Sequence, residues 1–504
     1  MYSTKNFTPR DYQLKILNSC KNKNSLICLP TGTGKTKLAI LIALNRLNEF
    51  PNSKIFFLTP TKPLASQIFE EFKEATNISK EKIILVTGAI SPEKRIGIYE
   101  NAVVVIATPQ TIEKDIEKKR IDLNNFSLLI IDECHRSRQN FANTKVAKSY
   151  ITDSKFSQII ALTASPGSDK EKINEICKNL YLSNIEIMTE EDNELKKHIK
   201  EKNIENILVD FPESFKGAHT LINGEYRLKL GGLKSFGLYK PISVISKTDL
   251  VNAQKRFIGE VRKKNHSAFY GMSLVSQLLK LSYCLEILET QSLKALHEFF
   301  KKLDKDESKA AKNIISNESI KEARSIIGRL IDNDIKHPKM IKLNEILIKE
   351  ISENKNYRAI VFANYRITID EIVDNLSKNN IKAKKFVGQA NKSSKGLNQK
   401  EQASVINNFK NLEFNVLVAS SVAEEGIDIP EVNAVIFYEP IGSELRKIQR
   451  SGRTGRTTPG KIIFLITRET RDVGIFYSSL RKEKKMKSML NKMKESNVFS
   501  KYEV

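Results

Sequence analysis

Short apolar runs alternate with longer stretches of helical periodicity through about the first 190 residues of the chain. The runs lie at residues 25–29, 55–58, 83–86, 103–107, 128–131 and 159–162. They are partly β-branched and almost uninterrupted by polar residues, so both faces of each predicted strand are apolar. Strands of this kind, separated by helices, are typical of a parallel sheet that helices cover on both sides. The pattern predicts an α/β domain.

A second series of apolar runs follows at residues 359–363, 383–387, 416–419, 434–438 and 461–466, and it predicts a second α/β domain. Between the two series, from about residue 205 to 335, long amphipathic stretches such as 274–303 and 320–331 replace the strands. We therefore expect α/β domains at residues 1–200 and 337–480, a helical insertion at 201–336, and a basic tail at 481–504.

Positive charge dominates the composition: 83 Lys and Arg residues against 59 Asp and Glu residues give a net charge of +24. Such an excess attracts polyanions, so nucleic acid is the first partner to consider. A lysine-rich composition that merely follows the source organism would give the same excess. Part of the charge lies at residues 481–495, which we interpret as a solvated terminal helix rather than a dedicated nucleic-acid contact.

The sequence shows no sign of a membrane segment or of a cysteine-based metal site. No apolar run approaches the roughly 18–20 residues that span a bilayer, and the first residues are polar. The five cysteines, Cys20, Cys28, Cys134, Cys177 and Cys284, are scattered without a C-x-x-C pair. We expect reduced thiols, no zinc site and a cytoplasmic protein.

The strongest local signal is LPTGTGKT at residues 29–36, between a predicted strand and the apolar helix predicted at 38–47. Small residues allow backbone N–H groups to curl around phosphates, and the N-terminus of the following helix adds a partial positive charge. In such a loop Lys35 reaches the β- and γ-phosphates and Thr36 can hold Mg²⁺. The segment predicts a nucleotide-binding loop.

A second signal, LIIDECH at residues 129–135, places two carboxylates at the carboxyl end of another buried strand. An Asp-Glu pair alone is usually a solvated turn. Beside a phosphate-binding loop, however, Asp132 can hold Mg²⁺ and Glu133 can polarise the water that attacks the γ-phosphate. The pair therefore predicts the second half of an ATP-hydrolysing site.

Three ordered motifs resemble those of superfamily 2 helicases: the GKT loop, DECH at 132–135 and QRSGRTGR at 449–456. Further matching segments lie at 9–13, 59–64, 108–111, 163–167 and 420–428. The resemblance covers nearly the whole chain. It implies two RecA-like parallel-sheet motor domains, with an α-helical insertion between them.

Within that superfamily the sequence resembles those of the archaeal Hef helicases and their FANCM and Mph relatives. The segments that carry this resemblance are 163–167, 361–366, 386–390 and 396–402. These relatives remodel forked and branched DNA and carry a thumb-like helical module between their motor domains. Many archaeal members continue into an XPF-type nuclease. This chain has no Glu-Arg-Lys-x-x-x-Asp motif, so the resemblance does not imply nuclease activity.

The resemblance also implies roles for individual residues. The implied catalytic residues are Lys35, Asp132, Glu133, Gln449, Arg453 and Arg456. The implied ATP-binding residues are Arg10, Gln13, Leu29, Pro30, Thr31, Gly32, Thr33, Gly34, Lys35, Thr36, Gly426 and Asp428, with Gln13 reading adenine. Thr36 and Asp132 would hold the metal, whereas His135, Thr163, Ala164 and Ser165 would couple hydrolysis to domain movement.

Two arginines of this set suit the chemistry for a physical reason. Planar guanidinium groups can meet the negative charge that develops on a transferred phosphoryl group. Arg453 and Arg456 lie in the second predicted domain, whereas Lys35 lies in the first. The complete site should therefore form only when the two domains close around ATP.

Nucleic-acid contacts are expected in both motor domains and in the insertion. In the motor domains the implied residues are Thr61, Lys62, Thr108, Gln110, Tyr365, Arg366 and Ser421. Their donors suit phosphates rather than base edges, although each residue alone could equally be a helix cap or a surface group. In the insertion, the basic residues are Lys255, Arg256, Arg262, Lys263 and Lys264. This cluster predicts either a face that contacts branched DNA or an ordinary amphipathic helix.

We interpret the chain as an ATP-dependent DNA helicase or translocase that acts on forked or branched DNA, without sequence preference, in replication fork repair and recombination. ATP and Mg²⁺ would be its cofactors, and a separate nuclease or a replication clamp is a candidate partner. One chain with both motor domains can work as a monomer. Two alternatives stay open: an RNA-stimulated ATPase, because motors related to Dicer and RIG-I-like proteins share the helical module, and an ATP-switched scaffold that binds junctions and recruits a nuclease.

Overall fold

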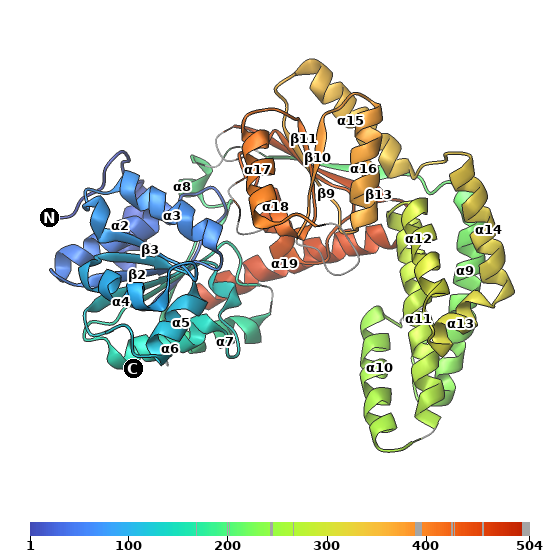
Figure 1. Ribbon diagram of the computed structural model, residues 1–504, viewed down its shortest axis with the longest axis horizontal. Coiled ribbons are helices and arrows are strands. Elements are labelled where there is room, and N and C mark those ends of the chain that lie inside the picture. Colours follow the sequence, from blue (N-terminus) through green and yellow to red (C-terminus); the bar gives the residue numbers. More distant parts are fainter. Residues whose placement is uncertain are drawn as a thin grey trace.

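The computed structural model describes residues 1–167, 169–198, 200, 202–241, 245–265, 267–388, 396–424, 427, 429–455 and 458–495. It contains two parallel sheets, each covered by helices, and a helical module that projects from the second sheet domain (Figure 1). The predicted α/β fold with a helical insertion is therefore confirmed. Within the described residues, no helix is both long enough and apolar enough to cross a membrane.

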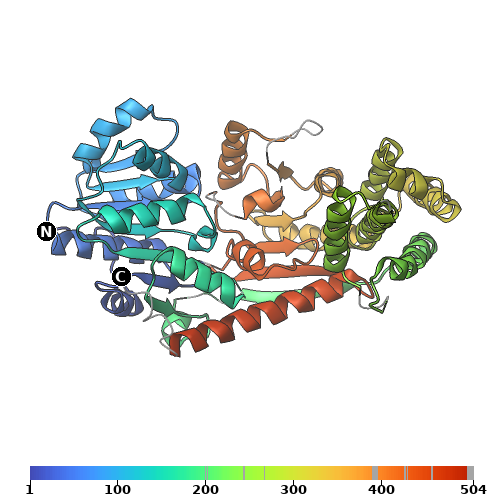
Figure 2. The same cartoon turned by 90° about the horizontal axis from the view of Figure 1, so that it is seen from below.

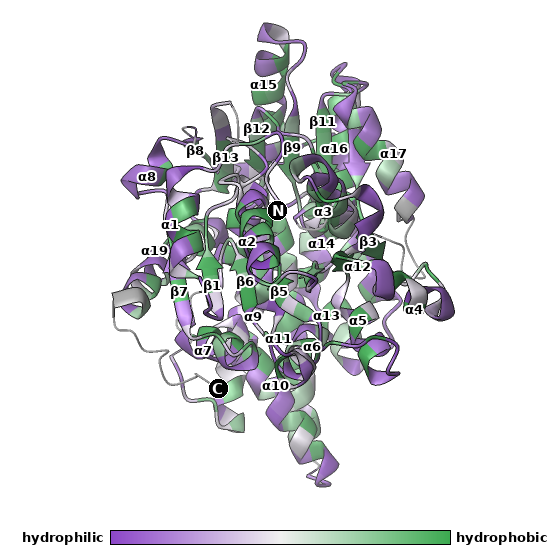
Figure 3. Ribbon diagram, turned by 90° about the vertical axis from the view of Figure 1, so that its left-hand side faces the viewer, coloured by the Kyte–Doolittle hydropathy of each residue, from purple (hydrophilic) through white to green (hydrophobic). Residues whose placement is uncertain are grey.

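The first sheet has the strand order β3-β4-β2-β5-β6-β1-β7, and every pairing in it is parallel. Its strands are β1 (Ser25–Cys28), β2 (Lys54–Leu58), β3 (Ile83–Val86), β4 (Val104–Ala107), β5 (Phe126–Ile131), β6 (Ile159–Thr163) and β7 (Asn184–Ile187). Strand β7 is an edge strand that the apolar-run pattern missed, because polar residues interrupt its short sequence. The central strands carry mainly hydrophobic residues along their whole length (Figure 3).

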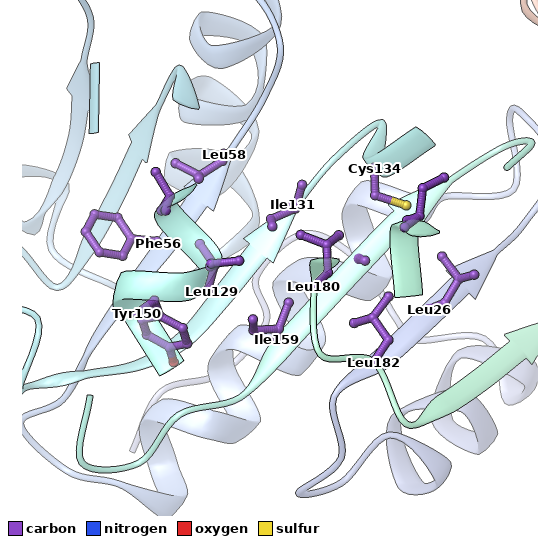
Figure 4. Packing of buried hydrophobic residues seen from close by; sticks show 14 of the residues in the cluster. Leu26, Phe56, Leu58, Leu129, Ile131, Cys134, Tyr150, Ile159, Leu180 and Leu182 are labelled. Carbon is purple, nitrogen blue, oxygen red and sulfur yellow. The ribbon is translucent and has the colours of Figure 1, made fainter. Parts of the chain in front are cut away.

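Helices cover this sheet on both faces because successive strand residues point to opposite sides. Phe57 packs with α2 (Lys35–Glu49) and α3 (Lys62–Ala75) on one face. Phe56 packs with residues of α5 (Pro109–Glu117), α6 (Ala142–Asp153) and α7 (Lys170–Asn179) on the other. Figure 4 shows part of this second core, with Phe56, Leu129 and Tyr150 in one cluster. Helix α4 (Pro92–Asn101) connects β3 to β4.

The second sheet has the order β10-β11-β9-β12-β13-β8, again with only parallel pairings. Its strands are β8 (Lys202–Val209), β9 (Ala359–Phe362), β10 (Ala383–Phe386), β11 (Val416–Ala419), β12 (Ala434–Phe437) and β13 (Gly460–Thr467). The helices of this domain are α15 (Pro338–Glu353), α16 (Arg366–Lys378), α17 (Gln399–Lys410) and α18 (Glu444–Ser451).

Strand β8 lies where the sequence analysis expects the helical insertion to begin. It pairs with β13 over its full length, from Lys202 beside Gly460 to Val209 beside Thr467. The sequence KNIENILV hides this strand because an edge position leaves much of it exposed, so polar residues interrupt the apolar run. The second domain therefore begins before the helical module, which is inserted into it.

The helical module consists of α9 (Glu213–Gly232), α10 (Lys247–Arg262), α11 (Ser267–Thr290), α12 (Leu293–Asp304), α13 (Lys309–Ile315) and α14 (Glu318–Asp332). The amphipathic stretch expected at 274–303 is two helices rather than one. The break occurs at Ser292, whose side chain accepts a hydrogen bond from Ala295 N at 3.1 Å and caps α12. Helices α10 and α11 form an extension that points away from the sheets (Figure 1).

The C-terminal helix α19 (Arg471–Glu495) is not the solvated tail expected from its charge. Its apolar side chains Met486, Leu490 and Met493 are buried in the core of the first domain. Figure 2 shows the helix running from the helical module, past the second sheet, to the first domain. The lysines led to the prediction of a solvated helix, but they cover only one side of it. Every third or fourth residue is apolar, so the helix is amphipathic. Helix α19 is thus a strap between the domains.

We predict that Leu490→Ala lowers the free energy of unfolding by about 2–5 kcal/mol, because it empties a buried position where the strap meets the first domain. Urea denaturation of the purified chain measures this change. Lys492→Ala, an exposed position on the same helix, serves as the matched control and should change stability by no more than about 0.5 kcal/mol. Equal stability of the two variants would show that the strap is not docked in solution.

Candidate ATP site and nucleic-acid interface

The glycine-rich loop connects β1 to α2 and is held tightly by its own backbone. Gly32 and Gly34 have φ angles of +79° and +83°, in the left-handed region that glycine adopts without a steric penalty. Thr33 Oγ1 donates to Pro30 O at 2.7 Å. Lys35, the first residue of α2, donates through Nζ to Leu29 O at 3.1 Å and to Pro30 O at 3.2 Å. The ammonium therefore already lies inside the curl of the loop.

Helix α1 (Asp11–Ser19) braces this loop from the side. Gln13 Nε2 donates to Gly34 O at 3.2 Å, and Gln13 Oε1 accepts from Arg10 N at 2.9 Å. The hydroxyl of buried Tyr12 donates to Thr33 O. The sequence analysis gave Tyr12 no role, because an aromatic residue beside a motif usually belongs to the core. Its position next to Gln13 was the one indication in the sequence that it contacts the loop.

Asp132 and Glu133 follow β5 and lie beside the loop. Enclosure by protein and the neighbouring Glu133 charge raise the pKa of the Asp132 carboxyl to about 7, while the Lys35 ammonium acts in the opposite direction. Glu133 N donates to Asp132 Oδ1 at 3.0 Å. Glu133 has φ +50°, a left-handed conformation that is uncommon outside glycine and that clusters at functional sites. The structure therefore brings Lys35, Asp132 and Glu133 together, as expected.

The four predicted coupling residues lie next to this carboxylate pair. His135 Nδ1 lies 3.2 Å from Glu133 Oε2 and 3.4 Å from Thr163 Oγ1. Thr163 Oγ1 accepts from Ser165 N at 3.1 Å and donates to Ser165 O at 3.0 Å. Cys28 Sγ donates to Ala164 O at 3.8 Å. A continuous polar path thus leads from Glu133 to Ser165.

Ser165 also contacts the strap. Its hydroxyl donates to Met486 Sδ at 2.9 Å, and both residues are buried. Met486 belongs to α19, which leaves the second sheet domain and ends against the first. The predicted coupling segment therefore contacts the helix that joins the domains. No sequence motif predicts this contact.

The second half of the site lies on α18 and the turn after it. Gln449 and Arg453 are both buried, and Arg453 donates to Glu424 O at 2.7 Å and to Ile427 O at 2.9 Å. Arg456, Gly426 and Asp428, three further predicted ATP-site residues, lie outside the described residues.

Arg450 is a functional-site residue to which sequence reasoning assigned no role. Its side chain is fully buried, Nε donates to Glu424 Oε1 at 2.7 Å, and the guanidinium lies 4.6 Å from the Phe362 ring centroid. Arg446 also binds the Glu424 carboxylate, from a more exposed position. Glu424 therefore anchors α18, and with it the predicted catalytic residues, to the body of the second domain.

The two halves of the site face one another across the domain boundary. Gly452, just after α18, lies so close to Thr31 of the loop that an added Cβ would come within 2.4 Å of Thr31 Oγ1. Beside this contact lies a cavity of about 470 Å³, lined by Pro30 and Thr31 from the first domain and by Lys447 and Ser451 from the second. The loop and the segment that follows α18 are thus in direct contact across the domain boundary.

Comparison with known families agrees with this arrangement. Residues 10–173 match the DEAD/DEAH box helicase family, and residues 339–458 match the helicase conserved C-terminal domain. Residues 214–359 match a helical bundle of a provisionally named ATP-dependent RNA helicase. The solved helicase domain of Pyrococcus furiosus Hef is 42% identical, with a TM-score of 0.74, and the match covers 94% of this chain and 98% of that one. The chain belongs to the Hef, FANCM and Mph1 group of superfamily 2 helicases.

Similar full-length proteins are longer than this helicase chain. A Methanocaldococcus jannaschii protein, provisionally named an ATP-dependent RNA helicase, is 40% identical over 489 residues, which are 97% of this chain and 61% of that protein. The ATP-dependent DNA helicase mph1 of Neurospora crassa is 33% identical over 475 residues, which are 91% of this chain and 41% of that protein. The chain thus spans about two fifths to three fifths of these relatives.

Several predicted nucleic-acid residues of the helicase lie at the carboxyl edges of its sheets. Thr61 and Thr108 precede α3 and α5, after the paired strands β2 and β4, so they share one edge of the first sheet. Lys62 is the first residue of α3, and Gln110 follows Pro109 in the first turn of α5. In the second domain, exposed Ser421 follows β11.

Two of the predicted contacts in the second domain hold its own structure together. Tyr365 donates through its hydroxyl to Glu286 Oε1 at 2.9 Å, so it binds α11 of the helical module. Burial and the Glu286 charge raise the pKa of this hydroxyl well above its usual value. Arg366, the first residue of α16, donates to Gly388 O at 3.3 Å. In this conformation Tyr365 is a joint between the module and the second domain.

The predicted basic cluster of the insertion lies on α10 and the turn after it. Lys255, Arg262, Lys263 and Lys264 are exposed, while Phe257 is buried, so the helix is amphipathic. Arg256 is held within the module instead: its guanidinium donates to the carbonyl oxygen of Phe236 and lies 4.7 Å from the Phe257 ring centroid. The other four cations are exposed to solvent. This exposure agrees both with a face that contacts branched DNA and with an ordinary amphipathic helix.

We predict that Arg450→Met lowers the free energy of unfolding of the helicase by about 3–5 kcal/mol, because it leaves the buried Glu424 carboxylate with one partner fewer. Arg446→Met removes the more exposed partner of the same carboxylate, and its cost should stay near or below about 1 kcal/mol. Chemical denaturation of both variants checks the difference. A larger effect at Arg446 would contradict the anchoring role of Arg450.

Proposed function

We propose that this chain is an ATP-driven motor that moves along and remodels forked or branched DNA. The observation that carries the proposal is the contact across the domain boundary, where Gly452 beside the arginine-bearing helix meets Thr31 of the phosphate-binding loop. A site assembled from two domains opens and closes as its nucleotide changes, which is how chemical energy becomes relative movement of the domains.

In the proposed mechanism the first domain binds the phosphates of ATP. The Lys35 ammonium exchanges the carbonyl oxygens of Leu29 and Pro30 for phosphate oxygens, and the N-terminus of α2 adds its partial positive charge. Gln13 and Tyr12 keep the loop in its curled form. Gln13 also presents its amide beside the loop, where it can read adenine.

Glu133 orients and polarises the attacking water, and arginines of the second domain balance the charge that develops on the γ-phosphate. Glu133 suits this role because its Oε2 is buried and has no well-aligned hydrogen bond among the described residues, although His135 stands nearby. Arg453 and Arg456 are the proposed arginines. Gln449, on α18, precedes Arg453 in the chain, and both side chains are buried.

The carboxylate and hydroxyl oxygens of Asp132 and Thr36 are the kind of hard donors that Mg²⁺ prefers. Burial and the Glu133 charge raise the pKa of Asp132, so a nearby positive charge would stabilise its ionised form. When bound there, Mg²⁺ would neutralise phosphate charge. Asp132 would serve as its carboxylate ligand and Thr36 as its hydroxyl ligand.

Hydrolysis would reach the rest of the molecule through the path from Glu133 by way of His135 and Thr163 to Ser165. Because Ser165 contacts Met486, a change at the carboxylate pair would also reach the strap. The strap begins beside the helical module, where Arg471 donates to Ser282 O at 2.7 Å. We therefore assign Ser165 and α19 to the coupling of ATP turnover with movement of the module.

DNA would run along the carboxyl edges of the two sheets. Thr61, Lys62, Thr108, Gln110, Arg366 and Ser421 offer hydroxyl, amide and cationic groups there, which suit phosphates and give little sequence preference. The net charge of +24 favours the same partner. The exposed cations of α10 are the proposed contact for a second arm of a fork.

DNA is favoured over RNA because relatives such as Neurospora mph1 and Schizosaccharomyces pombe fml1 are named ATP-dependent DNA helicases. The Methanocaldococcus relative carries an RNA helicase name, which keeps RNA as the competing substrate. The biological setting that we propose is replication fork repair and recombination, with one chain acting as the motor and a separate nuclease or clamp as partner.

We predict that Lys35→Ala and Glu133→Gln each lower DNA-stimulated ATP turnover by at least about a hundredfold, because they remove phosphate binding and water activation. DNA affinity should persist, since neither residue lies among the proposed DNA contacts. A coupled ATPase assay with and without DNA measures the first effect, and fluorescence anisotropy measures the second. Glu74→Gln, the same change at an exposed position of α3, is the control. Near-normal turnover in either variant would contradict the assignment.

We also predict that forked DNA stimulates ATP turnover more than blunt duplex DNA or double-stranded RNA at one salt concentration. Matched forks, duplexes, four-way junctions and RNA duplexes of equal length form the panel, with strand separation measured in parallel. Preference for RNA would replace the DNA proposal with the RNA-stimulated ATPase. Tight junction binding with background turnover on every substrate would favour the scaffold instead.

A further inference from the structure

A cavity of about 830 Å³ lies in the helical module, between α10, α11 and α13. Its walls include Gln254 from α10, Tyr270 and Gln277 from α11, and Lys309 and Asn313 from α13. These helices project away from the first sheet domain and its phosphate-binding loop (Figure 1). None of the five residues belongs to the ATP site or to the DNA contacts assigned above.

One wall of the cavity contains a buried acceptor that lacks a hydrogen bond. Gln277 is only 5% exposed, and its Nε2 donates to Ser273 O at 3.3 Å. Its Oε1 is buried and has no donor among the residues that the structure describes. Buried amide oxygens are normally paired, because an unpaired one loses its hydration without compensation. An N–H group on a ligand would satisfy this oxygen once the Gln277 side chain turns its amide toward the cavity.

The rim of the cavity carries an exposed aromatic ring beside a cation. Tyr270 is 67% exposed, and Lys309 Nζ lies 5.4 Å from the centroid of its ring. Phe269, also at the rim, is exposed as well. Large exposed aromatic side chains are costly in water and recur where flat rings stack on a protein surface.

The charge around the rim suits an anionic ligand. Lys309, on the wall of the cavity, is cationic and exposed. The two acids nearest to the start of α13 are Glu307, which is exposed, and Asp306. Asp306 is paired with Lys280 at 2.5 Å, and this pairing together with the backbone and side chain of Ser308 lowers the pKa of Asp306 below its usual value. The charge of Asp306 is therefore compensated and does not oppose a phosphate at Lys309, whereas Glu307 is exposed to solvent, which screens its charge.

We propose that this cavity holds one unpaired nucleobase of the strand bound by the motor. A nucleotide within a single strand has a group that matches each of three features of the cavity: the aromatic ring, the unpaired acceptor and the cation. Its base has a flat face for Tyr270 and N–H groups for Gln277, and its phosphate is an anion for Lys309. In a duplex the faces of a base are stacked and its Watson–Crick edge is paired, so the cavity would respond to the single-stranded part of a fork. The inference rests on the proposed function only in taking DNA as the source of the base.

The test measures binding without ATP, using a fork that carries one single-stranded arm. Tyr270→Ala should weaken binding about tenfold, in line with the loss of one stacked base. Tyr239→Ala, a change at a tyrosine of the same module that is 80% exposed and lies outside the cavity wall, is the matched control and should leave binding unchanged. Gln277→Leu keeps the size of the side chain and removes the unpaired oxygen. It should fold normally and weaken binding severalfold.

An arm of the same length built from abasic nucleotides separates base from backbone. The wild-type chain should bind this arm as weakly as Tyr270→Ala binds the normal arm, because the phosphates remain and the bases are absent. Equal affinity for normal and abasic arms, or equal loss in Tyr239→Ala and Tyr270→Ala, would overturn the proposal.

An RNA arm of the same sequence distinguishes the two sources of a base. Dependence on Tyr270 with the RNA arm alone would overturn the assignment to DNA. Failure of the proposed motor function remains distinguishable, because it appears as absent ATP turnover on every substrate, whereas this test measures affinity in the absence of ATP. At saturating fork concentration, Tyr270→Ala should hydrolyse ATP at the wild-type rate.

Discussion

The parallel direction of the strands determines where everything else in this molecule can lie. In a parallel sheet all strands end at the same edge, and the loops that follow them meet there. The phosphate-binding loop follows β1, Asp132 and Glu133 follow β5, and the segment from Thr163 to Ser165 ends β6. These strands are neighbours or near neighbours in the sheet order, although they are far apart in the sequence. The hydrogen-bond ladders of the sheet thus assemble a site from distant short motifs.

The second constraint is the attachment of the strap at both ends. At its start, the fully buried pair Lys339 and Asp472 fixes α19 to the second domain, and Arg471 binds Ser282 of the helical module. Near its other end, Met486, Leu490 and Met493 enter the core of the first domain. Separating a buried ion pair leaves a charge without its counter-ion inside the protein, and undocking the helix exposes apolar side chains to water. Both changes cost free energy. The strap therefore limits how far the domains can separate.

Much of the fold and of the ATP site could be predicted from the sequence, because both depend on local patterns. Buried parallel strands are apolar at every position, and a phosphate-binding loop needs glycines and a lysine in fixed order. The motif residues Lys35, Asp132 and Glu133 therefore lie as the sequence predicts, and the structure adds only their exact partners.

The features that sequence reasoning missed depend on contacts between distant segments. Strand β8 is recognisable only by its pairing with β13, since its own residues are half polar. The lysines of α19 conceal an apolar face whose partner lies in the first domain. Arg450 differs from Arg446, the other partner of the Glu424 carboxylate, in being fully buried, and Tyr365 differs from a surface tyrosine in its bond to Glu286. These contacts join residues that are distant in the sequence, so no local sequence pattern predicts them.

The pairing of β8 with β13 has a consequence for the order in which the chain folds. Arg468, just after β13, forms an ion pair with Asp210, just after β8, and these residues are 258 positions apart. A growing polypeptide can complete the first sheet early, because all seven of its strands precede residue 190. The second sheet must wait for nearly the whole chain to emerge, and its edge strand stays unpartnered until then. Because the helical module lies between β8 and the remaining strands, it can fold while that edge is still open, and its compaction would shorten the gap that the last pairing has to close.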